Sequence, residues 1–490
     1  MSFQSARFFV FLIVCLFLYY AVPKRWKNLF LLLASWFFYS CAGTAYFVLL
    51  VVVSAISYVV ADVIGCAKTK AVQTTMLVLG LVMLLGNLCF FKYYDWFGRQ
   101  LAIAASNLGS AYIPPDYGLA VPLGISFYTF VLSGYLIDVY QRKREPERNF
   151  VKLALFASFF PLVSSGPVER STGLLPQFDR PAPFQYDVFC QGASRILWGF
   201  FKKFVVADTL AVVVNRVFLD VTVHTGPYLL LAALFYSYQL YCDFSGYSDI
   251  AIGMARLFGF DVIENFRRPF AAHSFSDLWR RWHISLTSWF RQYLYFPLGG
   301  SRKGTIRTYL NILLIFLVSG IWHGTGLNFA IWGLLNGVYM VLGRASGNRR
   351  AVLARRNPLY RWAWLKALCQ IGIVYLLFTS CIVFFRAENL TQALWFYSRL
   401  ATGWTDLFHP MAVLNGLRNM GVGYATGVPV LIGVLMVEWG EWRAEKEGCS
   451  MGAWICRRPF AQKMAIYYLL LLALAFWGKL GTSSFIYFQF

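Results

Sequence analysis

The chain has 490 residues, of which 59% are hydrophobic and 13% are charged, whereas a soluble domain carries about 25% charged residues. This composition excludes an ordinary soluble globular protein and indicates a protein embedded in a membrane. The formal net charge is +22 at pH 7. A nucleic-acid-binding role is also excluded, because the basic residues lie in loops and form no soluble basic domain.

The apolar residues are grouped in many separate stretches, and a transmembrane helix needs roughly 20 of them. We therefore expect an all-α, polytopic transmembrane bundle with about 10–13 crossings. The stretch 151–165 ends in Ser-Ser-Gly-Pro, which predicts a re-entrant turn buried within the protein. Spanning or membrane-buried segments are expected near residues 8–22, 28–42, 44–64, 73–91, 119–140, 151–165, 188–207, 228–258, 306–322, 325–343, 365–385, 425–438 and 464–480.

Basic loops predict the orientation of the chain. Lys24–Lys27 follows the first apolar stretch, which has no convincing cleavage site and is not expected to be a signal peptide. By the positive-inside rule this loop is cytoplasmic and the N-terminus periplasmic. The loops Arg142–Arg148, Arg344–Lys366 and Arg457–Lys463 are expected on the cytoplasmic side too. Their partners are anionic lipid headgroups or, alternatively, a phosphate-bearing acyl donor.

Neither a disulfide framework nor a division into domains is indicated. The ten cysteines are scattered without any Cys-x-x-Cys pair, which predicts buried apolar thiols. No inverted repeat of the kind found in many transporters is visible. The stretch from about Glu388 to Thr426 is expected to be irregular. We expect a single integral membrane domain over residues 1–490.

His323 is one of five histidines and lies inside an apolar run from about Asn311 to Leu342. An ionisable side chain at hydrocarbon depth is costly, so it suggests a functional site. Gly320, Gly324 and Gly326 surround it with residues that allow a helix to bend or end. Alternatively, these glycines let two helices approach closely, as small residues do in membranes. Close packing would explain the glycines but not the histidine.

A second histidine lies in Phe275–Leu286, a segment dense in aromatic and basic residues: Trp279, Arg280, Arg281, Trp282 and His283. Read as one helix, it would begin with Ser276 or Asp277 as its N-cap. Trp279 would share a face with His283, and Asp277 with Arg281. The alternative is an interfacial amphipathic helix with its tryptophans in the aromatic belt. That alternative gives no reason for His283.

A third polar segment, Tyr241–Ile250, carries two carboxylates six residues apart, Asp243 and Asp249, interleaved with Ser245 and Tyr247. The carboxylates could pair with arginines from the 280s or orient an imidazole, and a structural salt-bridge role is favoured. A glycosidase pair is not expected at this depth. Zinc-ligand spacing and a phosphate-binding loop are absent. Direct transfer assisted by a histidine base is favoured over a covalent serine mechanism.

These motifs together resemble the membrane-bound O-acyltransferase family, in the bacterial branch around the membrane subunit of alginate and other polysaccharide O-acetylation. The resemblance extends along nearly the whole chain, through Val121–Phe130, Ser165–Arg170, Leu175–Phe178, Asp243–Asp249, Trp279–Leu286, Tyr295–Gly300, Trp322–Gly324, Phe385–Asn389 and Phe485–Phe490.

The resemblance implies that His323 is the catalytic histidine and His283 the family's second characteristic histidine. It also implies a helical bundle whose buried central channel joins a cytoplasmic donor side to an acceptor on the outer side. Two positions depart from many relatives: Val131 replaces a glutamine, and Leu327 replaces a tryptophan. Both bear on the acceptor, since the branch includes enzymes that modify alginate, cellulose and peptidoglycan, and cousins that transfer D-alanine to teichoic acids.

The resulting hypothesis is an O-acyltransferase of the bacterial inner membrane. It would move an acetyl group from a cytoplasmic thioester, with acetyl-coenzyme A as the expected donor, to a hydroxyl of an extracytoplasmic polysaccharide or of a periplasmic acetyltransferase partner protein. The alternatives are D-alanyl or other acyl transfer to a cell-wall polymer and, in a different class, a polymer or lipid transporter. No bound cofactor and no metal are expected. Besides His323 and His283, the expected site comprises Asp243, Ser245, Tyr247, Asp277, Trp279, Arg280, Arg281, Trp282 and Trp322.

Overall fold

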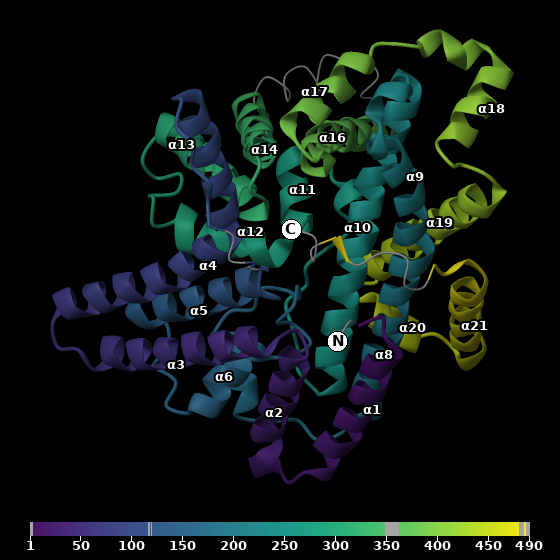
Figure 1. Ribbon diagram of the computed structural model, residues 1–490. Helices are drawn as coiled ribbons and strands as arrows, with labels where there is room; N and C mark the ends of the chain where they lie inside the picture. Colours follow the sequence, from purple (N-terminus) through teal and green to yellow (C-terminus); the bar gives the residue numbers. More distant parts are fainter. Residues whose placement is uncertain (1–2, 116–117, 119, 348–361, 480–484, 487–490) are drawn as a thin grey trace. The chain divides into compact units, whose positions relative to one another are not determined.

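The computed structural model describes residues 3–115, 118, 120–347, 362–479 and 485–486. These residues form helices, turns and loops, without any strand, which confirms the all-α prediction (Figure 1). They separate into two compact units, one of residues 1–193 with 251–263 and the other of residues 194–250 with 264–490. The expectation of one domain over residues 1–490 stays a prediction.

The first unit is built on a close-packed trio of helices, α3, α4 and α5, which lie side by side in Figure 1. Gly80 of α4 lies at their contact, because a Cβ there would come within 2.8 Å of Leu136 and 3.0 Å of Val60. Helix α8 contributes to both units. The helices that begin in this unit are α1 (Ala6–Ala21), η1 (Lys24–Trp26), α2 (Lys27–Ser40), α3 (Thr44–Cys66), α4 (Lys70–Asn107), α5 (Ile125–Tyr140), α6 (Phe150–Ser158), α7 (Leu175–Phe178) and α8 (Tyr186–Phe200).

The second unit contains the segments that carry both histidine motifs. Residues 226–250 of the long helix α10 belong to it. Its helices are η2 (Phe201–Ala207, a π-helix), α9 (Asp208–Leu219), η3 (Val221–Val223), α10 (Gly226–Leu257), η4 (Pro269–Ala271), α11 (Phe275–Arg281), α12 (Ile284–Phe290), η5 (Arg291–Tyr295, a π-helix), α13 (Thr305–His323), α14 (Leu327–Ala345), α16 (Ala363–Arg386), α17 (Leu390–Arg399), η7 (Trp404–Phe408), α18 (Pro410–Asn419), α19 (Tyr424–Lys446), α20 (Met451–Cys456) and α21 (Phe460–Trp477).

Five described helices are long and apolar enough to cross a membrane: α3, α4, α13, α16 and α21. The pair α18 and α19, bent by 86°, would make a sixth. This is fewer than the 10–13 crossings expected, because some apolar stretches form helices of only 16 residues, such as α1 and α5, and others are broken. In the stretch 151–165, for example, the helix ends at Ser158 and turns follow. The stretch expected to be irregular, Glu388–Thr426, in fact contains the short helices α17, η7 and α18.

Helices α13 and α14 form a tightly packed hairpin whose contact depends on two glycines. A Cβ at Gly320 would lie 2.4 Å from the carbonyl oxygen of Phe329, and one at Gly333 would lie 2.3 Å from that of Phe316. Because both neighbours are backbone atoms, the helices would have to separate to admit a methyl group. The predicted helix–helix role of the small residues is therefore correct for Gly320.

We predict that Gly333→Ala destabilises the protein by about 1–3 kcal/mol, because overpacking against a backbone oxygen cannot be relieved by a side-chain rotation. The matched control is Gly372→Ala in α16, where a Cβ meets nothing within 4 Å. Alanine favours helix over glycine by about 1 kcal/mol, so the control should be neutral or stabilising. Thermal denaturation in detergent measures both, and equal melting temperatures for the two variants would contradict the prediction.

Candidate active site

His323 is the last residue of α13 and is only 6% exposed. Its imidazole lies among aromatic rings, with centroid distances of 4.7 Å to Trp322, 5.1 Å to Trp332 and 5.4 Å to Phe385. The helix ends here because Gly324 adopts an extended backbone conformation. The predicted histidine is thus buried at the end of a candidate membrane span, in an aromatic surround.

The residues after His323 hold one side of this aromatic environment in place. The Asn328 Nδ2 group donates hydrogen bonds to the carbonyl oxygens of Phe384, at 3.1 Å, and Ala387, at 2.8 Å. These bonds tie the start of α14 to the end of α16 and hold Phe385 between them. Close approach also explains Gly326, where a Cβ would lie 2.0 Å from the Asn328 side-chain oxygen.

His283 lies at a break between α11 and α12, in the left-handed conformation with φ 45° and ψ 52°. The prediction of one helix with Trp279 and His283 on a shared face is therefore wrong. The predicted N-cap is wrong too, since the Ser274 hydroxyl accepts the hydrogen bond from the Asp277 N–H. The predicted Asp277–Arg281 pair is confirmed, with 3.2 Å between the carboxylate and Nε.

The His283 ring is 1% exposed and held on two sides. Its Nδ1 atom lies 3.0 Å from the side-chain oxygen of Asn265. The Phe244 ring lies edge-to-face at 4.7 Å. Burial lowers the pKa of the His283 imidazole to about 3, because desolvation disfavours the imidazolium. The ring is therefore neutral at physiological pH.

The two tryptophans of this segment are buried in the helical core, so the alternative that they form a membrane-interface belt is wrong. The Trp279 ring lies 5.0 Å from Phe316 and 6.2 Å from Trp332. Since Trp332 also contacts His323, a chain of ring contacts joins α11 to His323. Trp282 packs elsewhere, 4.9 Å from Phe378.

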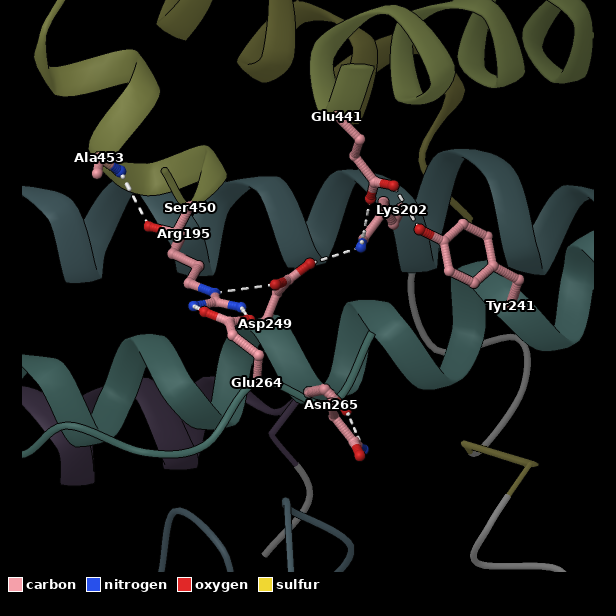
Figure 2. Close-up of polar contacts among 10 residues, drawn as sticks. Arg195, Lys202, Tyr241, Asp249, Glu264, Asn265, Glu441, Ser450 and Ala453 are labelled. Carbon is pink, nitrogen blue, oxygen red and sulfur yellow. Dashed lines mark hydrogen bonds and ion pairs between the residues drawn. The ribbon is translucent and has the colours of Figure 1, made fainter. Parts of the chain in front are cut away.

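The two carboxylates of α10 pair with cations that precede them in the chain, not with arginines of the 280s. Asp243 pairs with Lys203, and its second oxygen accepts the backbone N–H of Ile486 at 2.9 Å. Asp249 accepts from Arg195 Nε at 2.9 Å and pairs with Lys202 (Figure 2). Both carboxylates form salt bridges, as was favoured, with partners that were not foreseen.

Asp249 and its partners Arg195 and Lys202 line a cavity of about 450 Å³ in the second unit. Lys202 Nζ reaches Glu441 at 3.0 Å, and Arg195 Nη1 donates to Glu264 at 2.7 Å, as Figure 2 shows. The cavity therefore has both charge signs on its wall. Its charged residues are Arg195, Lys202, Asp249, Glu264, Arg267, Arg268, Glu441 and Glu445. Apart from Asp249, sequence reasoning missed them, although charges within the apolar segment 188–207 were a usable signal.

The remaining predicted site residues are spread over the second unit. Ser245 lines the cavity. Tyr247 is buried, with its ring 4.7 Å from Phe485. Arg281 also pairs with Glu445, at 2.7 Å, so its charge is compensated, whereas Arg280 is exposed.

A serine motif in the C-terminal part of the chain bears on the preference for a histidine base. Residues 448–452 fit Gly-x-Ser-x-Gly, the pattern of a serine-hydrolase nucleophile elbow. Such an elbow joins a strand to a helix, whereas this segment follows helix α19. The Ser450 hydroxyl accepts from the N–H of Ala453 as the N-cap of α20 (Figure 2). The described residues that line its cavity include no histidine, so Ser450 has a capping role.

Comparison of the sequence with known protein families identifies the class of enzyme. Residues 7–387 match the MBOAT, membrane-bound O-acyltransferase family, and the chain belongs to that family. It is thus a multi-pass membrane O-acyltransferase.

Three relatives show which acyltransferases the chain is similar to. The chain is 39% identical to the probable alginate O-acetylase AlgI of Pseudomonas putida, over 82% of this chain and 80% of the relative. It is 35% identical to the peptidoglycan O-acetyltransferase of Helicobacter pylori, over 76% and 74%. It is 30% identical to the teichoic acid D-alanyltransferase of Bacillus subtilis, over 46% and 60%.

The lowered pKa of His283 predicts a pH-dependent stability. Between its folded pKa near 3 and the ordinary unfolded value near 6.5, the unfolded chain binds the proton and the folded chain does not. The contribution of neutral His283 to the free energy of unfolding is therefore fully present above about pH 6.5. It is lost as the pH falls, by up to about 1.4 kcal/mol per pH unit.

His283→Gln should remove this component, so its melting temperature should fall less than that of the wild type between pH 7 and pH 4.5. Exposed His409 supplies the control, His409→Gln, which should follow the wild type. Parallel pH curves for His283→Gln and the wild type would rule out a depressed pKa.

Proposed function

We propose that this protein transfers an acetyl group from a cytoplasmic thioester, acetyl-coenzyme A, to a hydroxyl on the periplasmic side of the inner membrane. The acceptor is a polysaccharide or a periplasmic partner protein that completes the transfer. The observation that carries this proposal is the similarity, over 82% of the chain, to a protein named as a probable alginate O-acetylase. Membership of an acyltransferase family favours this over the transporter alternative.

In the proposed reaction His323 is the general base. The imidazole takes the proton of the acceptor hydroxyl as its oxygen attacks the thioester carbonyl. The tetrahedral intermediate then expels the thiolate, which receives that proton from the imidazolium and leaves as the thiol. A positioned base contributes about 10²–10⁴ in rate. The burial of His323 at the end of a candidate span supports the assignment.

His283 is proposed to position or polarise a reactant by hydrogen bonding, which suits a neutral, buried ring. Of the two neighbouring arginines, exposed Arg280 is the better candidate to bind donor phosphates, because Arg281 is already paired with two carboxylates.

The alternative acyl group is D-alanyl. The similarity to a teichoic acid D-alanyltransferase over 46% of the chain supports this alternative.

We predict that His323→Ala, His323→Asn and His323→Gln lose essentially all acetyl transfer, a fall of at least about 10²-fold, because none can take the proton. His283→Gln should retain measurable transfer, since glutamine still offers a hydrogen-bonding group. The measurement is transfer of labelled acetyl from acetyl-coenzyme A by membranes with matched expression, alongside acetyl content of surface polysaccharide. His409→Gln should match the wild type. An active His323→Gln with an inactive His283→Gln would reverse the two roles.

We predict that the N-terminus is periplasmic and that the loops Arg142–Arg148 and Arg344–Lys366 are cytoplasmic; residues 348–361 of the second loop lie outside the described residues. Single cysteines placed in these loops should resist an impermeant thiol reagent added to intact spheroplasts. All ten native cysteines must first be replaced, four of which are exposed: Cys41, Cys66, Cys89 and Cys369. Ready labelling of either loop from outside would overturn this orientation.

A further inference from the structure

Asn265 connects the segment after α10 to the backbone break at His283. Its side chain is 0% exposed. Its backbone carbonyl accepts the N–H of Ile284, the first residue of α12, at 2.9 Å. Two residues later, the N–H of Arg267 donates to the carbonyl of Arg281 at 3.0 Å. The strained left-handed conformation of His283 is thus held between backbone hydrogen bonds to one short segment.

The orientation of the Asn265 amide follows from its neighbours. The backbone N–H of Ser285 points at one amide atom, at 3.4 Å, and the Ser285 hydroxyl lies 2.9 Å from the same atom. A backbone N–H can only donate, so this atom is the carbonyl oxygen. The amide nitrogen, on the other side, donates to the Ser248 hydroxyl at 3.0 Å.

This orientation fixes the tautomer of His283. The atom that faces His283 Nδ1 is the same carbonyl oxygen, which can only accept. Nδ1 therefore carries the hydrogen and donates. A neutral imidazole has one donor and one acceptor nitrogen, so Nε2 is the acceptor of the ring. The edge-to-face Phe244 ring, with an interplanar angle of 80°, restrains rotation of the imidazole about its bond to Cβ.

We propose that Asn265 is a positioning residue for acyl transfer, which holds His283 in the Nδ1–H tautomer and so presents Nε2 as a hydrogen-bond acceptor to a reactant hydroxyl or thiol. This proposal rests on the role proposed for His283 above. An amide differs from the carboxylate that orients the base in a Ser-His-Asp triad, because it offers no negative charge to an imidazolium. Asn265 therefore suits a histidine that stays neutral and orients a reactant.

A double-mutant cycle tests whether Asn265 acts through His283. Asn265→Ala should lower kcat roughly 10-fold or more in the wild type, with a smaller change in KM, because the ring can then rotate and exchange tautomers. In the His283→Gln background, the same change should cost under about 3-fold. The matched control is Asn311→Ala, another buried asparagine, whose side-chain amide donates to the carbonyls of Leu298 and Gly300. Its loss should be equal in both backgrounds.

Asn265→Asp keeps an acceptor for the Nδ1–H and tests the charge argument, and it also covers the case in which Asn265→Ala does not fold. It should recover part of the lost kcat at high pH. Because the new carboxylate favours the imidazolium, the acid limb of its pH–rate profile should shift to higher pH. An equal loss from Asn265→Ala in both backgrounds, or an unchanged acid limb in Asn265→Asp, would reduce Asn265 to a structural residue and overturn the proposal.

A spectroscopic measurement tests the tautomer of His283 without relying on acetyl transfer. In protein labelled with ¹⁵N-histidine, the signals that vanish in His283→Gln belong to His283, and their shifts should show a protonated Nδ1 in the wild type. The opposite tautomer would overturn the proposal even in an active enzyme. A wild-type protein that transfers no acetyl group, but shows the Nδ1–H tautomer, would instead reject the proposed function and retain the assignment of Asn265 as the partner that fixes the ring.

Discussion

Polar groups buried among apolar helices must find partners within the protein, and the second compact unit is organised by this requirement. The carboxylates of α10 are its clearest case, since Asp243 and Asp249 are both buried and both paired with lysines of η2. Such pairs add little net stability compared with apolar packing, but removing one partner costs about 3–5 kcal/mol because it leaves an uncompensated charge. Their main effect is to fix which faces of α10 and η2 meet.

The same reasoning extends from charges to amides. Asn328 and Asn265 are both buried, and each satisfies carbonyl or hydroxyl groups of a segment far away in sequence. The first fixes an aromatic wall beside His323, and the second fixes the ring of His283. Each histidine is therefore supported by an asparagine that contributes geometry without charge. Neither amide adds an ionised group beside its ring.

What the sequence could predict was local. Apolar stretches predicted an all-α membrane protein, helical spacing predicted the Asp277–Arg281 pair, and the motifs indicated the family. The failures concern long-range partners. Lys203 lies 40 residues before Asp243, and Arg195 lies 54 before Asp249, so no local pattern connects them. Fewer long apolar helices form than apolar stretches were counted, because composition does not show where a helix begins, ends or breaks.

At His283 the wrong prediction of a continuous helix coincides with a predicted site residue. Helical spacing from Trp279 to His283 is favourable, yet the chain leaves the helix and adopts a left-handed conformation that costs a non-glycine residue roughly 1 kcal/mol or more. The hydrogen bonds that Asn265 accepts from Ile284 and Ser285 compensate this cost, and they exist only when the segment after α10 is in place. The left-handed backbone conformation therefore directs the imidazole away from the helical face and toward Asn265. A helical continuation would have kept His283 on the face of Trp279, in the aromatic core, without the amide that orients it.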